Sequence, residues 1–195
     1  EIDAVKIGML SQIPVIETIA SGIQKHNAKN IVFDPVMVAT SGDLLLAENA
    51  VEAIKKVMMP LADLLTPNLH EAAKLTGEDL ATSQDAMVSQ AESLLSAGAK
   101  AVLIKGGHGD DNKCTDLLAD ASGINWFVSE RIDTKNTHGT GCSLSSAIAA
   151  NLAKGQTMLE AVGNAKEWLT GAIASSNDLN VGKGSGPVHH FHALW

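Results

Sequence analysis

The sequence predicts an α/β fold in which a central, mostly parallel sheet is covered by helices on both faces. Short apolar segments alternate along the chain with longer segments whose apolar residues recur at helical spacing. Apolar runs without alternation are typical of strands buried on both sides. The chain has 195 residues and is 45% hydrophobic, so it can bury one sizeable core, and we expect a single domain over residues 1–195.

Four expected strands and four expected helices occupy residues 4–104. Turn residues end the strands: Pro35 closes one, because proline cannot donate a hydrogen bond to a neighbouring strand. Apolar residues three and four apart predict the helices, and Thr82 with Asp85 has the spacing of a capping box. The expected strands are residues 4–9, 31–33, 62–65 and 101–104, and the expected helices are residues 14–26, 44–58, 68–75 and 82–97.

A change of pattern in the second half of the chain predicts a hairpin followed by two helices. Residues 115–119 and 125–129 flank a turn of about four residues at 120–123. The helices are expected at residues 139–154 and 158–175, and Thr157 with Glu160 gives the second one a capping box. The glycine-rich tail at residues 181–187 is expected to be irregular.

Composition argues against several classes of function. The formal net charge of −8 disfavours nucleic-acid binding, because phosphate backbones require clustered Lys and Arg. The two cysteines, Cys114 and Cys142, give neither a disulfide framework nor metal-ligand spacing, so a cytoplasmic location is expected. No apolar run approaches the ~18 residues of a membrane span, and the start of the chain shows no signal-peptide pattern. We therefore expect neither a nucleic-acid nor a membrane partner.

The carboxyl ends of the expected strands are the places to look for a ligand, because parallel sheets bind ligands there. Residues 8–9, 34–37, 66–68 and 105–107 follow the four strands. They supply polar and charged groups, notably Asp34, Asn68 and Lys105. We expect these groups to lie along one edge of the sheet.

The strongest local signal is the sequence Asn-Thr-His-Gly-Thr-Gly-Cys at residues 136–142, directly before an expected helix. Its glycines let the backbone approach a ligand, and the helix start offers unpaired N–H groups to an anion such as a phosphoryl group. The spacing matches neither a Walker A loop nor a dinucleotide fingerprint. An ordinary glycine-rich helix start is the plain alternative, and a nucleophilic pair of Cys142 with His138 is a remote one.

This loop resembles the anion-hole signature of hydroxymethylpyrimidine/phosphomethylpyrimidine kinases, ATP-dependent enzymes of the ribokinase-like superfamily that act in thiamine biosynthesis. Five more motifs agree with that family in order: Asp-Pro-Val-Met at 34–37, Ser-Gly at 41–42, Thr-Pro-Asn-Leu-His-Glu-Ala at 66–72, Val-Leu-Ile-Lys-Gly-Gly-His at 102–108 and Gly-Ser-Gly-Pro-Val-His-His-Phe at 184–191. The family commonly has Thr at the position of Ser143, and the wider superfamily usually has Asp at Cys142. The family's first quarter, a βαβ segment with a substrate loop and a pyrimidine-recognising Gln, has no counterpart here. The resemblance therefore implies the last three quarters of a kinase domain that is a homodimer when full length, and an inactive isolated segment.

The resemblance also implies roles for particular residues. Cys142 would accept the proton of the substrate hydroxyl, while the N–H groups of Gly139, Thr140 and Gly141 would hold the transferred phosphoryl group. The remaining roles fall to the strand ends and one helix: Lys105, Gly107, Asn68 and Lys166 would bind ATP, Glu71 and Asp34 would hold Mg²⁺ directly or through water with Asn68 beside them, and Met9 and Val36 would pack against the pyrimidine.

Each of these residues also has a plain structural explanation. Asp34 could cap a turn, and Asn68 with Glu71 could be a helix cap and its capping-box partner. Lys105 could end a strand, Lys166 could be a solvated surface residue, and Met9 could belong to the core. Three nearby histidines, His189, His190 and His192, are expected in a surface or packing role instead of a metal site.

Two other functions remain open at this point. A pyridoxal or pyridoxine kinase would share the fold and the anion hole and would differ mainly in its ring contacts. A truncated, non-catalytic ligand-binding remnant is the alternative from another class.

Overall fold

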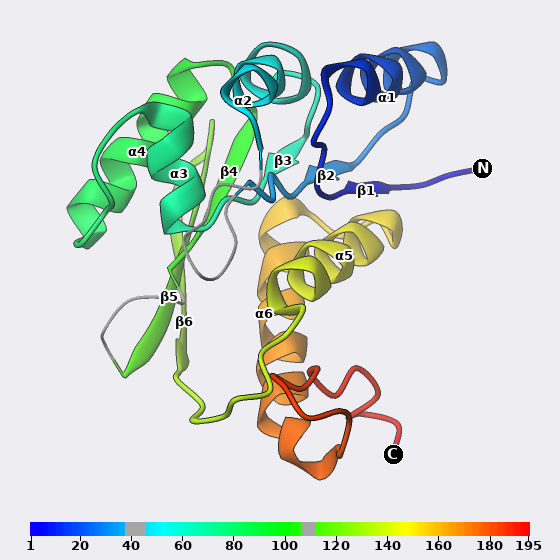
Figure 1. The fold of residues 1–195 in the computed structure, drawn as a ribbon, viewed down its shortest axis with the longest axis vertical. Helices are drawn as coiled ribbons and strands as arrows, with labels where there is room; N and C mark the ends of the chain where they lie inside the picture. Colours follow the sequence, from blue (N-terminus) through cyan, green and yellow to red (C-terminus); the bar gives the residue numbers. More distant parts are fainter. Residues whose placement is uncertain (38–45, 107–111) are drawn as a thin grey trace.

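Six strands form one sheet whose spatial order follows the sequence, β1-β2-β3-β4-β5-β6 (Figure 1). The computed structural model describes residues 1–37, 46–106 and 112–195. The strands are β1 (Val5–Ile7), β2 (Ile31–Phe33), β3 (Leu64–Leu65), β4 (Ala101–Lys105), β5 (Lys113–Asp120) and β6 (Gly123–Glu130). Strands β1 to β4 pair in parallel, and β5 and β6 continue the sheet as an antiparallel hairpin. The predicted fold class, a mostly parallel sheet with helices on both faces, is confirmed.

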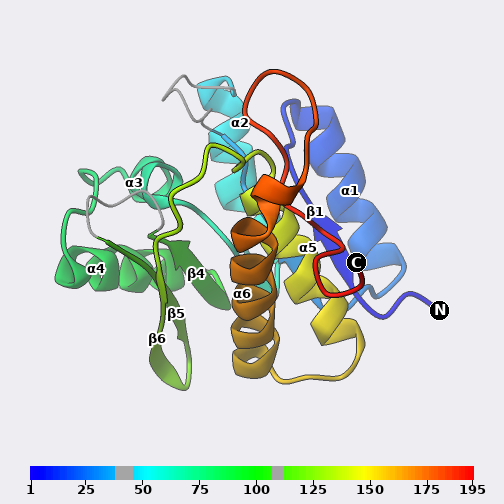
Figure 2. The same ribbon diagram turned by 90° about the horizontal axis from the view of Figure 1, so that it is seen from below.

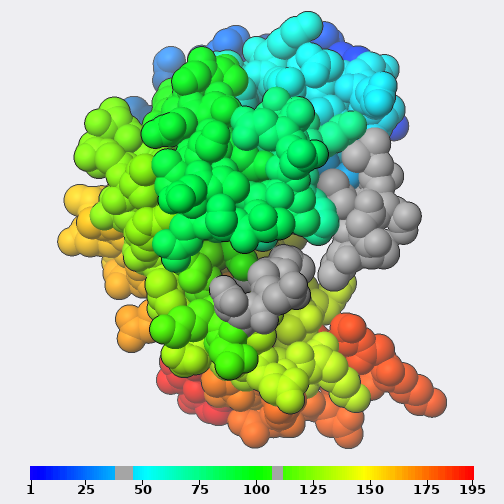
Figure 3. Space-filling model, turned by 90° about the vertical axis from the view of Figure 1, so that its left-hand side faces the viewer, coloured from blue at the N-terminus to red at the C-terminus, as the bar shows by residue number. Residues whose placement is uncertain are grey.

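Successive strand residues face opposite layers, which explains why the strands are apolar throughout. Phe33 and Ile104 face one core, whereas Val32 and Leu103 face the other, and all four are fully buried. The first core lies under α1 (Ile13–Lys25), α2 (Glu48–Ala53), the π-helical turn η1 (Ile54–Met58), α3 (Leu69–Thr76) and α4 (Gln84–Ser96). In Figure 3 the residues of α3 and α4, in green, form much of the surface on that side of the molecule.

Two helices cover the opposite face of the sheet. They are α5 (Thr140–Ala153) and α6 (Met158–Ala174), and a short 3₁₀ turn, η2 (Ser176–Asp178), follows them. Figure 2 shows α5 and α6 side by side across this face. Thr157 caps α6 and exchanges hydrogen bonds with Glu160, as predicted. The hydroxyl and N–H of Thr157 stabilise the Glu160 carboxylate and lower its pKa.

Three predicted details differ from the structure. The hairpin turn has two residues, 121–122, because Asp120 and Gly123 still pair and the Asp120 carboxylate accepts from the N–H of Ser122 at 2.7 Å. Ser83, not Thr82, caps α4, since its hydroxyl accepts from Ala86. The helix expected from residue 44 begins at Glu48 among the described residues and ends in the π turn.

The C-terminal segment returns to the start of α5. His138 forms an isolated bridge with Pro187, and the N–H of His189 donates to the carbonyl of Ala172 on α6. Of the tail expected to be irregular, residues 181–187, the structure shows a bend at 183–185 and the isolated bridge at Pro187, with no helix or strand. No helix in the described part of the chain is long and apolar enough to cross a bilayer.

Candidate active site

An ion pair between Lys105 and Asp34 lies at the carboxyl ends of β4 and β2. Lys105 Nζ is 2.8 Å from Asp34 Oδ1, and the two side chains are 14% and 2% exposed. Thr66, which follows β3, donates its hydroxyl to the same carboxylate oxygen at 3.2 Å. The ends of three neighbouring strands therefore meet at one carboxylate, and the plain alternative for Asp34, a local turn cap, does not describe its side chain.

Helix α5 brings a fourth group to this cluster. Ser145 is 1% exposed, and its hydroxyl lies 3.2 Å from Asp34 Oδ2 and 3.0 Å from the carbonyl of Gly141. The hydroxyl has one hydrogen to share between these acceptors. Ser145 thus ties the first turn of α5 to the end of β2.

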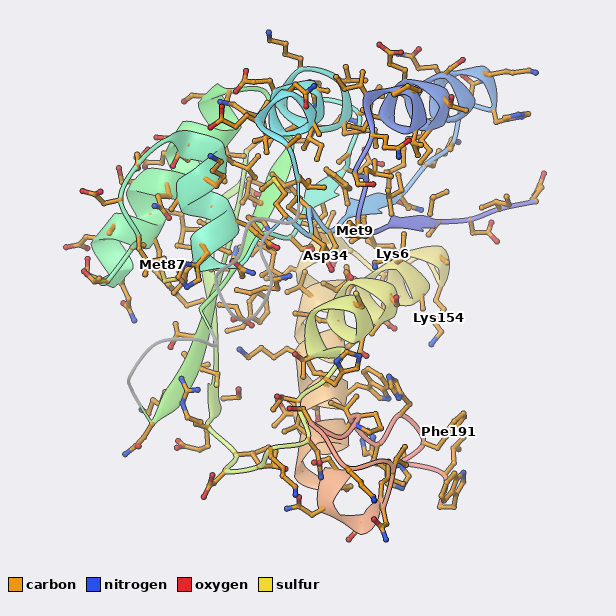
Figure 4. All side chains as sticks on the ribbon, viewed as in Figure 1. Lys6, Met9, Asp34, Met87, Lys154 and Phe191 are labelled. Atoms are coloured by element: carbon orange, nitrogen blue, oxygen red, sulfur yellow. The ribbon has the colours of Figure 1, made fainter. Side chains whose placement is uncertain are left out.

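The start of α5 faces the same ion pair. A Cβ atom placed on Gly141 would lie 3.3 Å from Lys105 Nζ and 4.0 Å from Asp34 Oδ2. The helix begins at Gly139, which has a left-handed φ of 82° and, being glycine, no side chain that could cap the first turn. The backbone here is therefore within reach of the Lys105 ammonium, as an anion hole requires (Figure 4, where Asp34 is labelled).

The free N–H groups at this helix start differ from those expected. Thr140 N is directed at the carbonyl of Thr137 at 3.4 Å, a long contact. Within the described residues, the N–H groups of Gly139, Gly141 and Cys142 have no acceptor. The backbone of Cys142 is therefore a donor that the sequence reasoning missed, and Thr140 is the least available of the three predicted donors.

Asn68 and Glu71 form the capping box that the sequence offered as their plain explanation. Glu71 N donates to Asn68 Oδ1 at 2.9 Å, and Asn68 N donates to Glu71 Oε2 at 2.8 Å. The other Glu71 oxygen accepts from the N–H of Met37 at 3.3 Å, so Glu71 also links α3 to the segment after β2. Burial raises the pKa of Glu71 above its usual 4.5, and the Asp34 charge adds to that rise, whereas Lys105 and the two N–H donors oppose it.

The donor set at this edge fits a hard divalent cation. Glu71 and Asp34 are both nearly fully buried, and among the described residues one ammonium, that of Lys105, pairs with Asp34 and lowers the pKa of Glu71. Their oxygens keep unused lone pairs, since each carboxylate has about four acceptor positions. No group of three or more acidic, His or Cys residues is arranged as a metal cage in the described part of the chain. Glu71 and Asp34 could hold a cation that keeps water and phosphate ligands, as Mg²⁺ does.

The structure does not bring Lys166 to this cluster. Its ammonium lies 2.6 Å from Asp116 Oδ2 and 2.9 Å from the carbonyl of Cys114, both on β5. The Lys166 and Asp116 side chains are 11% and 8% exposed, so Lys166 is not the solvated surface residue of the plain alternative either. Asp116 was not singled out from the sequence.

The two predicted pyrimidine contacts lie at the same edge of the sheet. Met9 follows β1 and is 55% exposed, so it is not a core residue, and Figure 4 shows it near Asp34. Val36 follows β2 and is half-buried. The predicted nucleotide contact Gly107 and the motif residues Ser41, Gly42 and His108 lie outside the described residues.

Cys142 is exposed and lines a cavity of about 570 Å³ between α5, α6 and the C-terminal segment. The lining runs along α5 as far as Lys154 and includes Trp168 and His190, but neither Lys105 nor Asp34. Since the ion pair and the glycine-rich helix start carry the charges that a phosphoryl group needs, we place the site there and regard this cavity as its neighbour. Within the described residues, Cys142 and His138 form no hydrogen bond with each other, which leaves the nucleophilic pair unsupported.

The three histidines have packing roles, as expected, against the end of the chain, α5 and α6. His189 is buried, and its ring lies 4.9 Å from that of Trp195. His190 Nε2 is 2.9 Å from the hydroxyl of Ser143, and the His192 ring lies 6.1 Å from Trp168. These contacts hold the tail against α5 and α6.

Comparison with known proteins adds the following findings. A model of the family described as phosphomethylpyrimidine kinase matches residues 1–189. A hydroxymethylpyrimidine/phosphomethylpyrimidine kinase of Rhizobium meliloti is 49% identical over 195 residues, which are 100% of this chain and 73% of the relative. An ADP complex of Bacillus subtilis pyridoxal kinase superposes with a TM-score of 0.90 at 38% identity, over 98% of this chain and 71% of the other. A phosphomethylpyrimidine kinase structure from Clostridium difficile gives a TM-score of 0.76 at 40% identity, over 88% and 69%.

Proposed function

Because the chain belongs to the phosphomethylpyrimidine kinase family, we propose that it transfers a phosphoryl group from ATP to hydroxymethylpyrimidine and then to the resulting monophosphate, in thiamine biosynthesis. The observation that supports this most strongly is the approach of Gly141 to Lys105 and Asp34. That approach puts a helix start with free N–H groups beside a lysine, which suits the charge of a transferring phosphoryl group.

The proposed mechanism relies on positioning and charge, because phosphoryl transfer needs little covalent chemistry from the protein. The N–H groups of Gly139, Gly141 and Cys142, with Thr140 closing the turn, would hold the γ-phosphoryl oxygens. Lys105 would neutralise the nucleotide phosphates, and its ion pair with Asp34 keeps the ammonium at the strand ends. Cys142 would act as the base that accepts the proton lost by the substrate hydroxyl.

Mg²⁺ is the cation that we assign to Glu71 and Asp34, with Asn68 beside them. When bound, it would neutralise charge on the phosphates. The two carboxylates would hold it directly or through water, and the capping box orients Glu71 for this. Gly107, next to Gly106 at the end of β4, is proposed to contact the phosphates, and Met9 and Val36 the pyrimidine ring.

A pyridoxal kinase is the second candidate, because a pyridoxal kinase is among the solved structures that superpose well on this chain. Both functions use the same phosphoryl site and differ in the ring that is bound. Steady-state kcat/KM for hydroxymethylpyrimidine, its monophosphate and pyridoxal, followed by coupled ADP release, separates them. A higher kcat/KM for both pyrimidines supports the proposal, and a higher value for pyridoxal would replace it. Because the relatives extend beyond the matched segment, this assay uses the protein as encoded.

Two further properties are proposed, the first from the family likeness and the second from the cysteine content. We expect a homodimer of a kinase whose domain includes residues 1–195, and a cytoplasmic location. Size-exclusion chromatography with light scattering tests the first, and fractionation of cells tests the second.

A further inference from the structure

Two lysine–aspartate pairs lie on the α5–α6 face of the sheet. Lys105 pairs with Asp34 at 2.8 Å, and Lys166 pairs with Asp116 at 2.6 Å. Lys105 and Asp116 are directly opposite each other in the β4–β5 ladder. Opposite residues of antiparallel strands project from the same face with Cβ atoms about 5 Å apart. Asp116 is therefore a natural partner for Lys105, yet the Lys105 ammonium lies on Asp34.

Asp116 is occupied by two other groups. Oδ2 accepts from Lys166, and Oδ1 accepts from the backbone N–H of Gly106 at 2.9 Å. Lys166 also donates to the carbonyl of Cys114, which fixes the ammonium against β5. A buried carboxylate that lacked its lysine would attract a neighbouring cation, and Lys105 lies directly opposite Asp116 in the ladder.

The backbone around Lys105 is fixed on both sides. Lys105 N donates to the carbonyl of Pro67 at 2.8 Å, and the next N–H, of Gly106, donates to Asp116. Gly106 passes so close to β5 that a Cβ atom there would lie 2.0 Å from the Thr115 carbonyl oxygen. Only glycine fits, so the N–H of Gly106 can approach Asp116 and the end of β4 cannot shift freely.

We propose that Lys166 and Asp116 are positioning residues for Lys105, and that Lys166 does not contact the nucleotide. Lys166 neutralises Asp116, Asp116 anchors Gly106, and the Lys105 ammonium is thereby left to Asp34 and the first turn of α5. This inference rests on the proposed function only in taking Lys105 as the phosphate-binding lysine. It replaces the expectation that Lys166 binds ATP directly.

The test compares ADP affinity, by titration calorimetry in the protein as encoded, among Lys166→Met, Asp116→Asn and the double variant. Lys166→Met should lower ADP affinity about tenfold or more, because Asp116 then draws Lys105 away from the phosphates. In the Asp116→Asn background, the change of Lys166 to Met should alter ADP affinity by less than about threefold, because no carboxylate remains to draw Lys105 away. If Lys166 contacted the nucleotide, the lysine change would cost about tenfold in both backgrounds, and that result would overturn the proposal.

Two further variants serve as a charge-conserving comparison and a control. Lys166→Arg keeps the positive charge and should retain most of the ADP affinity. Lys100→Met is the matched control: Lys100 lies 2.8 Å from Asp63, whose other oxygen accepts from the N–H of Ile31, so the same arrangement occurs away from the carboxyl ends of the strands. Its ADP affinity should equal that of the unaltered protein.

Folding and function are separated within the same series. If Lys166→Met does not fold, the comparison of Asp116→Asn with the double variant still decides, because neither leaves a buried carboxylate without its lysine at this position. ADP binding without pyrimidine turnover would refute the proposed function and leave this inference in place. Absence of ADP binding by the unaltered protein would overturn both.

Discussion

Lys105 Nζ lies 2.8 Å from Asp34 Oδ1, although 71 residues separate the two in the sequence. The pair joins the ends of β4 and β2, which flank β3 in the sheet. Thr66, the residue after β3, donates to the same carboxylate oxygen of Asp34. The start of α5 approaches this ion pair at Gly141, so the strand ends and the first turn of α5 meet at Lys105 and Asp34.

Lys105→Met should both weaken ADP binding and destabilise the fold. It leaves Asp34 buried without its cation, which costs about 3–5 kcal/mol in unfolding free energy. Denaturant unfolding and calorimetry measure the two effects. The control is Lys113→Met, an exposed lysine at the start of β5. Unchanged stability of Lys105→Met would show that Asp34 does not depend on this partner.

Cys142→Ala should affect the two phosphorylation steps unequally. With hydroxymethylpyrimidine, loss of the base should lower kcat by about 10²–10⁴-fold. With the monophosphate, the attacking oxygen is already ionised near neutral pH, because the second pKa of a phosphate monoester is about 6. The loss should then be much smaller, and ADP affinity should barely change. Cys114→Ala is the control, and an equal loss in both steps would remove Cys142 from the proton transfer.

Glu71→Gln should raise the Mg²⁺ concentration needed for half-maximal rate. The change removes one of the two carboxylates next to Lys105 and replaces an acceptor of the Met37 or Asn68 N–H by a donor. A Mg²⁺ titration of the initial rate tests this, with Glu78→Gln, an exposed residue just after α3, as the control. An unchanged Mg²⁺ requirement would contradict the metal assignment.

The pH dependence of stability tests the environment of Glu71 without any metal. Burial raises the pKa of Glu71, so the folded protein holds its proton above pH 4.5, where the unfolded chain has begun to lose it. The folded state then binds more protons, and its unfolding free energy falls as pH rises from 4.5 through the raised pKa. Glu71→Gln cannot titrate, so the stability of the unaltered protein relative to this variant should fall over that interval. A difference that stays constant or grows with pH would show that the pKa is not raised.

Ser145→Ala should lower both the unfolding free energy and turnover. The hydroxyl is buried between Asp34 and the first turn of α5, and its loss should cost about 1–2 kcal/mol. Its neighbour Ser146 is exposed on the same helix and serves as the matched control. Equal thermal stability and turnover of Ser145→Ala and Ser146→Ala would show that the Ser145 hydroxyl contributes neither to stability nor to catalysis.

The sequence predicted the parts of the site that depend on strand ends. Pro35 and Gly106 mark where β2 and β4 stop, and the rule for parallel sheets then places Asp34 and Lys105 on one edge. Capping-box spacing likewise predicted the exchange between Asn68 and Glu71. These features are local, so they can be recognised from spacing alone.

Contacts between elements could not be predicted in the same way. Ser145 contacts Asp34 because of the way α5 packs on the sheet. The one feature of the sequence that could have indicated this contact is that Ser145 follows Gly141 by four residues, one helical turn. The packing of α6 puts Lys166 on Asp116, which lies opposite Lys105 in the β4–β5 ladder, and the sequence did not specify that register. Met9 was apolar and could have been core, yet it is exposed beyond β1.

Transfer of the labelled γ-phosphoryl group of ATP, followed with hydroxymethylpyrimidine as acceptor in the protein as encoded, tests the central claim most directly. The account predicts that the label enters the pyrimidine monophosphate first and the diphosphate later, and that Cys142→Ala slows the first transfer more than the second. Label that never reaches the pyrimidine, although pyridoxal accepts it under the same conditions, would contradict the account.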